Sequence, residues 1–533
     1  MEKITEFNSS MRILIIGEII IFTLSSVCTF FLIRFLSVED YSIYNLILVV
    51  PIILIYVLDF GLFSGCSYYV ARLSKLNKKE ESRNVIKITL ITKILLGIGL
   101  AVTVYFLAKE IVFSLLGIQN PILILLLQLV SILLITENLL HAVRSILIGS
   151  TKMNTYIMVK VIRNFTRLVF TILLVLLGWN LFGPVIGLIL ATGMAGLVGL
   201  LCIQKNLLKH SGKKQSIDWK CLPQVIRKGF SFSFISVMKN IKYEVFILIL
   251  AIFGFYTEVS FLKVGLVITS IFYVILRPVM ISLFPIFSKY SWSNLSERTT
   301  LTQVFHYSTK FCNLFITPVI IFCIVFAFEL IPLVFGMKYL AGSQFISVFL
   351  FYFLPLTIGM VTIPTFFFSQ GHPNLAVLIE FFSFSVSILA GICFSLFLGS
   401  FGFAIGISLG AFLGLVFGIF LTNRKFGKGL FSKTKESILI IVIAGLLCGF
   451  FFVGYYFFTS VIMLENPILK LLVLGGVFVC FYILFIILLI QINIIRYQEI
   501  SYFIQEMQKI PLVNRVLPFV IIIGKKFWKR NNK

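Results

Sequence analysis

The sequence predicts an all-α polytopic membrane protein with about fourteen transmembrane helices, arranged as two six-helix lobes plus two additional helices. Of the 533 residues, 59% are hydrophobic and only 12% are charged, whereas a soluble domain has roughly half apolar and about a quarter charged residues. A soluble globule could not cover so much apolar surface. Backbone groups in hydrocarbon must bond internally, which leaves helices or closed barrels. Apolar runs such as 438–459 continue for about 20 residues without the alternation of a barrel strand, so helices are expected.

Apolar runs bounded by charged, proline-containing or glycine-containing loops define the expected spans. The first run carries Glu18 and lacks a small-residue cleavage site, so it is a span and not a removable signal peptide. The predicted spans are 11–33, 43–67, 86–107, 121–142, 157–177, 183–203, 229–253, 260–287, 305–328, 343–367, 376–398, 402–422, 437–459 and 467–491.

The connections between these spans carry most of the basic residues. When the amino terminus is placed in the cytoplasm, every basic cluster falls on the cytoplasmic side, as the positive-inside rule requires. We therefore expect a multi-pass protein of the cell membrane with both termini cytoplasmic. The cluster assigned to the fourth connection consists of Arg144, Lys152, Lys160, Arg163 and Arg167.

Several function classes are disfavoured by composition. The net charge of +25 is spread over membrane-flanking loops, where it attracts anionic lipid headgroups, and it forms no nucleic-acid-binding motif. The nine cysteines are scattered without CxxC spacing, so we predict no metal and no cofactor. No connection between spans exceeds about 30 residues or bears the clustered acids that a membrane glycosyltransferase needs, so no enzymatic activity is expected.

A weak internal repeat divides the chain. Sliding the first two spans by 218 residues places 35–40 on 253–258, two short loops that end in an acid, and Asp59 on Arg277. Six-helix units that start on the same side form a parallel repeat, which predicts two lobes around a cavity. The expected organisation is a lobe at 1–203, a cytoplasmic linker at 204–228, a second lobe at 229–422, two further helices at 423–491, and an amphipathic basic cytoplasmic tail at 492–533.

Two motifs resemble those of the polysaccharide flippase family, which shares a superfamily with multidrug and toxic-compound extrusion transporters and lipid II flippases. The first is Phe31-Leu-Ile-Arg-Phe-Leu-Ser-Val-Glu-Asp-Tyr-Ser-Ile-Tyr44, with Ser42 where the family commonly has glycine. The second is Asp59-Phe-Gly-Leu, followed by Tyr69-Val-Ala-Arg72. Beyond these motifs, the resemblance is one of topology and loop lengths over nearly the whole chain. It implies translocation of a lipid-linked oligosaccharide by alternating access.

Four charged residues fall inside the predicted helices of the first lobe: Glu18, Asp59, Lys93 and Glu137. Charged side chains within a membrane-spanning helix normally face a cavity or a group of opposite charge. Three acids and one base predict a paired network with acid in excess, and a surplus carboxylate can carry a proton or bind Na⁺. Glu18, Asp59 and Glu137 are therefore the predicted ion-coupling residues, with H⁺ or Na⁺ as the partner. Pairing that merely holds the lobe together is the alternative.

The second lobe holds more bases than acids at the same depth. Lys239 and Lys242 are three residues apart and share a helix face, and Arg277 follows on the next helix. Glu244 alone cannot neutralise all three, and a phosphate or diphosphate needs fixed positive charge in place of water. Lys239, Lys242 and Arg277 are the predicted substrate-binding residues, together with Arg34 from the first family-like motif. For Arg34 an interfacial role stays open.

The leading hypothesis is a flippase that moves a lipid-linked oligosaccharide from the cytoplasmic to the outer leaflet, with membrane lipids as its other partners. An ion-coupled exporter of drugs or organic cations is the alternative. Such an exporter is expected to line its cavity with acids and aromatic rings and not with Lys239, Lys242 and Arg277.

Overall fold

The computed structural model describes residues 2–494 except 116, 118, 119, 209–217, 432, 433 and 463–465. Within this part of the chain every regular element is a helix and no strand occurs. The predicted tail at 492–533 lies outside the described residues from residue 495 onward. The all-α polytopic fold class predicted from the sequence is confirmed.

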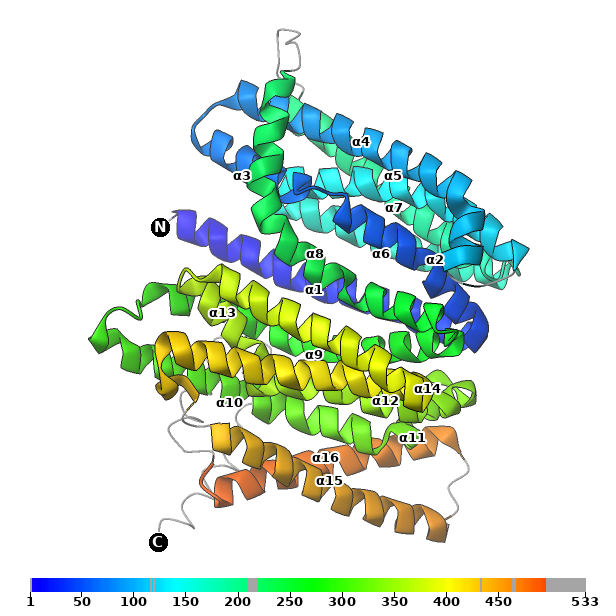
Figure 1. Cartoon of the computed structure of the whole chain (residues 1–533), viewed down its shortest axis with the longest axis vertical. Helices are drawn as coiled ribbons and strands as arrows, with labels where there is room; N and C mark the ends of the chain where they lie inside the picture. Colours follow the sequence, from blue (N-terminus) through cyan, green and yellow to red (C-terminus); the bar gives the residue numbers. More distant parts are fainter. Residues whose placement is uncertain are drawn as a thin grey trace.

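The first lobe, at the top of Figure 1, comprises helices α1 to α7, which pack on one another. The turns between its helices are short, and successive helices run in opposite directions except α2 and α3, which follow one another across the bundle. Its helices are α1 (Glu2–Phe35), α2 (Val38–Val57), α3 (Leu62–Lys75), α4 (Lys79–Glu110), α5 (Pro121–Gly149), α6 (Met153–Leu176) and α7 (Phe182–Ile203).

The second lobe lies below the first in Figure 1, and two further helices lie below it. Helix α8 packs on α2 and α3 of the first lobe as well as on α9 and α14 of the second, and α15 packs on α10. The remaining helices are α8 (Leu222–Ile252), α9 (Tyr256–Lys289), α10 (Leu295–Val325), α11 (Ala327–Phe335), α12 (Ser343–Leu350), α13 (Thr362–Ser369), α14 (Pro373–Phe426), α15 (Thr434–Ile462) and α16 (Pro467–Gln491).

The predicted number of fourteen spans stays a prediction. Ten segments of the described residues are long and apolar enough to cross a membrane. The predicted spans 376–398 and 402–422 fall in one of the ten, α14, which bends at Gly399 (φ 60°, ψ −145°). The spans 157–177, 229–253 and 260–287 are not among the ten.

The predicted span 43–67 is not one helix. It breaks between α2 and α3, where Phe60 (φ 47°) and Gly61 (φ 82°) adopt the left-handed backbone that glycine tolerates best. The Oδ2 atom of Asp59 accepts a hydrogen bond from the Phe63 amide at 3.2 Å, at the start of α3. The acid in this family-like motif therefore satisfies a free N–H at a helix terminus.

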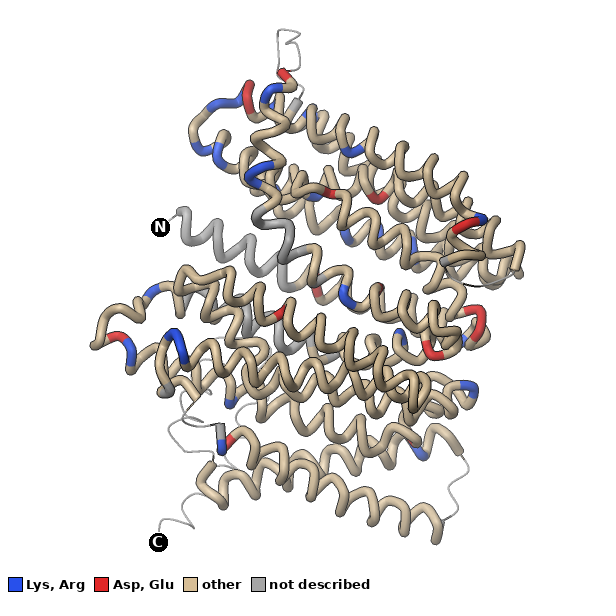
Figure 2. Tube along the Cα trace, in the orientation of Figure 1, with Lys and Arg blue, Asp and Glu red and all other residues tan. Residues whose placement is uncertain are grey.

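The two ends of the bundle differ in charge. We call the end at which α1 begins, and at which the α3–α4 and α5–α6 turns lie, the basic end, and the opposite end the distal end. Lysine and arginine residues gather toward the basic end, on the left of Figure 2. Those of the α3–α4 region are Arg72, Lys75, Lys78 and Lys79.

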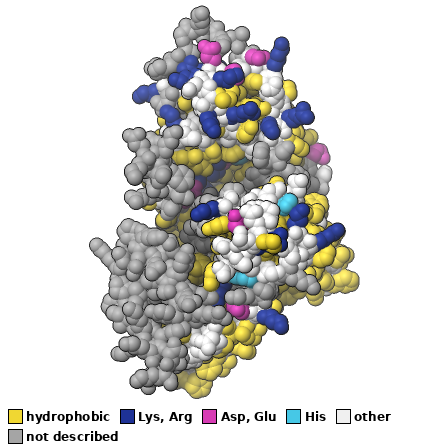
Figure 3. Space-filling view, turned by 90° about the vertical axis from the view of Figure 1, so that its left-hand side faces the viewer, with side chains coloured by type: hydrophobic (Ala, Val, Ile, Leu, Met, Phe, Trp, Pro, Cys, Tyr) yellow, Lys and Arg dark blue, Asp and Glu magenta, His cyan; other side chains and the backbone are white. Residues whose placement is uncertain are grey.

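The hydrophobic core is continuous at the distal end and divided at the basic end. One cluster of buried side chains joins the distal halves of both lobes, from Leu32 in α1 to Phe403 in α14, and also includes side chains of α15 and α16. Toward the basic end, one cluster is confined to the first lobe and the start of α8, and another to the second lobe. Figure 3 looks onto the basic end and shows the surface hollowed between the lobes. The lobes are thus joined at the distal end and separated at the basic end, except that the start of α8 packs on the first lobe.

The lobes meet at equivalent positions of the predicted repeat. The hydroxyl oxygens of Ser42 (α2) and Ser260 (α9), which are 218 residues apart, lie 2.7 Å from each other. The Ser42 hydroxyl donates to the Thr257 carbonyl at 3.4 Å, and the Ser260 hydroxyl donates to the Val38 carbonyl at 2.6 Å. Near-reciprocal contacts between residues at equivalent repeat positions are expected beside a two-fold axis. We call the contact of Ser42 with Ser260 the polar seam, and it supports the 218-residue repeat.

Candidate functional site

In the first lobe, Asp59 pairs with the ammonium group of Lys93 from α4, and both side chains are almost completely buried. The Lys93 ammonium also approaches the Asn138 Oδ1 atom on α5 at 3.4 Å. Asp59 lies at the break between α2 and α3, and it therefore links this break to α4 and, through Lys93, to α5. These contacts are of the kind that hold a lobe together.

Three bases follow one another on one face of α6. Because α6 begins at Met153, Lys160, Arg163 and Arg167 are in the helix and not in a loop. Their spacing of three and four residues places them on one side. Lys160 pairs with Glu18 of α1, and Arg163 pairs with Glu137 of α5. Arg167 donates to the Tyr44 hydroxyl at 3.3 Å.

A fourth base, Arg144 of α5, lies within electrostatic range of Arg163, Glu137 and Tyr56. The four bases have only two acids beside them, Glu18 and Glu137, which leaves an excess of two positive charges. We call Arg144, Lys160, Arg163 and Arg167, with Glu18 and Glu137, the α5–α6 basic cluster.

The arginines of this cluster are incompletely satisfied. Among the described residues, the buried Nε–H groups of Arg144, Arg163 and Arg167 have no hydrogen-bond partner. A buried donor without a partner costs about 1–3 kcal/mol. Arg163 is nevertheless 27% exposed, whereas Glu137 is 9% exposed. The cluster combines uncompensated charge, unused donors and partial access, the conditions under which an anion can be bound.

The excess of acid expected in the first lobe is not found among the described residues. Glu18, Asp59 and Glu137 each have a basic partner. The expectation was wrong because Lys160 and Arg163 were assigned to a connection. The i, i+3, i+7 spacing of residues 160, 163 and 167 was the signal that could have placed them on a helix face. Ion coupling through the three acids stays a prediction.

The predicted substrate-binding residues of the second lobe are only partly described. Lys242 is buried, lies 3.8 Å from Glu380 of α14 and places its ammonium 5.0 Å from the centre of the Tyr352 ring. Glu244 pairs with Lys263 of α9 at 3.0 Å. The side chains of Lys239 and Arg277 lie outside the described residues. A substrate role for Lys239, Lys242 and Arg277 stays a prediction.

Arg34 lies at the distal end and contacts the second lobe. Its Nη1 atom is 3.5 Å from the Val334 carbonyl of α11. In the opposite direction, the Lys338 ammonium donates to the Arg34 carbonyl at 3.0 Å and to the Leu36 carbonyl, near the carboxyl terminus of α1. Cations favour this end of a helix, where carbonyl groups lack internal partners. We call these contacts, of Arg34 with Val334 and of Lys338 with Arg34 and Leu36, the distal latch.

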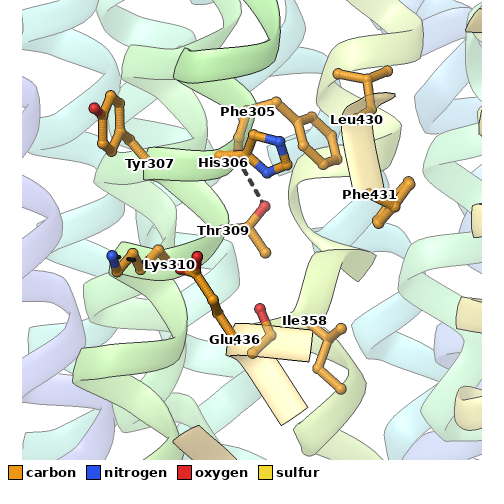
Figure 4. Close-up of a pocket in the computed structure, with 10 residues that line it drawn as sticks. Phe305, His306, Tyr307, Thr309, Lys310, Ile358, Leu430, Phe431 and Glu436 are labelled. Atoms are coloured by element: carbon orange, nitrogen blue, oxygen red, sulfur yellow. Dashed lines mark hydrogen bonds and ion pairs between the residues drawn. The ribbon is translucent and has the colours of Figure 1, made fainter. Parts of the chain in front are cut away.

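A small pocket toward the basic end of α10 and α15 is shown in Figure 4, lined among others by His306, Lys310 and Glu436. Lys310 and Glu436 point toward each other, 3.6 Å apart. Beside it, the Asn313 side-chain amide donates to the Ser437 carbonyl at 3.0 Å. These contacts attach the first additional helix to the second lobe. In the part of the chain that the structure describes, no three His, Cys, Asp or Glu side chains are arranged to hold a metal ion.

Comparisons with known proteins identify the family of this chain. A family model described as "Polysaccharide biosynthesis protein" matches residues 9–291. No match was found among curated proteins.

Three solved structures are similar in fold. The lipid II flippase MurJ in an inward closed conformation has a TM-score of 0.66 at 15% identity, covering 90% of this chain and 99% of that one. An inward-facing multidrug resistance MATE family transporter of the MOP superfamily has a TM-score of 0.62 at 17% identity, covering 77% and 94%. An outward-facing structure of such a transporter reaches 0.53 at 18% identity, covering 79% and 96%. The fold is that of these membrane transporters, and it superposes better on the inward-facing arrangement.

Proposed function

This chain belongs to the polysaccharide biosynthesis protein family, and from that premise we propose that it is a flippase that moves a lipid-linked oligosaccharide across the cell membrane by alternating access. The basic end faces the cytoplasm in this proposal, and both termini lie on that side, as the positive-inside rule favours. The separated lobes at the basic end then offer an entrance to the cytoplasmic leaflet.

The observation that carries the proposal is the excess positive charge of the α5–α6 basic cluster. Four bases face two acids, and three of the bases keep a buried Nε–H without a partner in the described structure. An exporter of cations has no use for such an excess, because the cluster repels its substrate. A lipid-linked sugar carries a phosphate-containing linkage that fixed cations can hold in place of water.

Transport requires the distal end to open while the basic end closes. The polar seam of Ser42 and Ser260 and the distal latch are hydrogen-bonded contacts between the lobes. Contacts of this kind contribute about 0.5–1.5 kcal/mol each, somewhat more when a charge takes part. They are weak enough to break in each cycle, so that the lobes can separate at the distal end.

Export of organic cations is the second candidate, and one observation favours it. Glu18 and Glu380 are partly exposed, at 28% and 27%, and acids of this kind attract cations. The MATE structures to which this fold is similar are multidrug resistance transporters. In this chain, however, each of these acids already contacts a lysine.

One reconstitution experiment separates the two functions. The purified full chain is inserted into lipid vesicles that contain a fluorescent lipid-linked oligosaccharide in both leaflets, and an impermeant quencher reports exchange between leaflets. Parallel vesicles receive a fluorescent organic cation. We expect exchange of the lipid-linked sugar well above protein-free vesicles and no accumulation of the cation. The reverse result contradicts the proposal.

A further inference from the structure

Two hydroxyl groups at the distal end are buried without a hydrogen-bond partner. They belong to Tyr339, on the turn before α12, and to Ser343, the first residue of α12. Both side chains are fully buried, and neither hydroxyl has a partner among the described residues. We propose that these two hydroxyls oppose closure of the distal end, because they lack hydrogen bonds while the lobes are joined there and regain them from water when the lobes separate.

The turn that carries these hydroxyls lies between the first lobe and α9. Next to Tyr339, the Lys338 ammonium donates to the Arg34 carbonyl at 3.0 Å. A Cβ atom on Gly336 would lie 3.3 Å from the Nη1 atom of Arg34. On the other side, the centre of the Tyr339 ring lies 6.4 Å from that of Phe261 in α9. Separation of the lobes at this end therefore uncovers the turn.

Burial of the two hydroxyls destabilises the closed distal end. Buried donors are normally hydrogen-bonded, and a buried donor without a partner raises the free energy of the state in which it is buried. Tyr339 belongs to the apolar cluster that joins the lobes, and a water molecule would need several polar partners to be held there. Closure thus removes water from two hydroxyls and gives them no new partner in the part of the chain that the structure describes.

Neighbouring residues of this turn act in opposite directions. Lys338, in the distal latch, donates to two carbonyl groups of the first lobe and stabilises the closed distal end. Tyr339 and Ser343 destabilise it. Opposing contributions keep the free-energy difference between two conformations small, so that both are populated. Because the distal end opens only in the proposed transport cycle, this inference rests on the proposed function, and it adds what sets the balance between the closed and open states.

Tyr455 provides an internal comparison. Its hydroxyl is also buried and has no partner within the described ranges, and its side chain belongs to the same apolar cluster. Tyr455 is on α15, however, where its ring centre lies 5.6 Å from that of Phe326. Helix α15 packs on α10 and α16, so separation of the lobes does not bring water to Tyr455.

Opening of the distal end can be measured without any substrate. In the full chain without its nine native cysteines, held in nanodiscs, Ser260→Cys places a thiol at the polar seam, where the parent side chain is fully buried. A maleimide reaches this thiol only when the distal end opens, so the labelling rate reports the open population. Tyr339→Phe and Ser343→Ala should each lower this rate about fivefold or more, and together they should lower it further.

Tyr455→Phe is the matched control. It removes the same kind of hydroxyl, but from a position that lobe separation does not hydrate. Its labelling rate should stay within about twofold of the parent, whereas the midpoint of thermal unfolding should rise in Tyr455→Phe and Tyr339→Phe alike. Equal slowing of labelling by Tyr455→Phe would reduce the effect to general stabilisation and overturn the inference.

Ser347→Ala tests whether the missing partner is the cause. Ser347 lies one helical turn beyond Ser343 in α12, but its hydroxyl donates to the Ile324 carbonyl at 3.0 Å. Removal of a hydroxyl that has a partner should not slow labelling. If Ser347→Ala slows labelling as much as Ser343→Ala does, the lack of a partner is irrelevant and the inference is overturned. Should Tyr339→Phe fail to fold, Ser343→Ala with this control still decides the question.

Unchanged or faster labelling in both Tyr339→Phe and Ser343→Ala overturns the inference, and this result is expected if a water molecule bridges the two hydroxyls in the closed state. The labelling assay contains no lipid-linked sugar, so its outcome is separate from that of the vesicle assay. Slower labelling in both variants, combined with no exchange of lipid-linked sugar by the wild type, would refute the proposed substrate and leave the role of the two hydroxyls intact.

Discussion

The two lobes are alike where they meet and different inside. At the seam the same residue type occupies equivalent positions, Ser42 and Ser260. In the interior, the described bases of the second lobe are matched by acids, whereas the α5–α6 basic cluster of the first lobe has two more bases than acids. The symmetric part of the molecule is suited to relative motion of the lobes, and the asymmetric part is suited to chemical recognition.

The largest expected effect comes from fixing the seam. In a background without the nine native cysteines, Ser42→Cys with Ser260→Cys should form a disulfide, because the parent hydroxyl oxygens are 2.7 Å apart and a disulfide needs such close side chains. Oxidation should abolish transport in vesicles, and a reductant should restore it. Each single cysteine variant is the control. Full transport by the cross-linked protein would mean that the distal ends need not separate.

The second effect tests the difference between the interiors. Arg144→Gln with Arg167→Gln removes two charges from the first lobe, and Lys263→Gln with Glu244→Gln removes two from the second. Since each lost charge-assisted hydrogen bond costs about 1.5–3 kcal/mol, the first pair should lower transport at least about a hundredfold at limiting substrate. The second pair should stay within about twofold of the wild type per folded molecule. Equal losses in both pairs would erase the distinction between the lobes.

The sequence predicted the architecture better than the site. Helix positions follow from local hydropathy, so most apolar runs became helices where expected. The pairing of Lys160 with Glu18 joins residues 142 positions apart, and only the packing of α6 on α1 creates it. Counting Lys160 and Arg163 as loop charges was the natural error, because the positive-inside rule reads bases as markers of topology and does not ask which helix face they occupy.

A third, smaller effect concerns Lys93 and Asp59, the most deeply buried of the ion pairs in the described part of the chain. Lys93→Met alone leaves a buried carboxylate and should destabilise the protein by about 3–5 kcal/mol. Lys93→Met with Asp59→Asn should recover most of this loss, as measured by thermal unfolding in detergent.

The same double variant tests whether Asp59 couples transport to an ion. If pairing is the whole role of Asp59, the double variant transports with the pH and Na⁺ dependence of the wild type. A lost dependence in a stable double variant would instead assign ion coupling to Asp59.

The smallest effect concerns the distal latch. Lys338→Met removes the donor to the Arg34 and Leu36 carbonyls and should favour opening of the distal end by roughly 1–2 kcal/mol, because the contact is near the surface. Spin labels on α2 and α9 beyond the seam would report the change as a larger population of long distances. An unchanged distance distribution would show that the latch contributes nothing to closure.

The most direct test is a structure of the full chain with a diphosphate-linked oligosaccharide bound. The account predicts phosphate density within hydrogen-bond distance of Arg144, Arg163 or Arg167, in the lobe with excess charge. Phosphate density beside Lys242 in the second lobe, with the three arginines making no contact to it, would contradict the account.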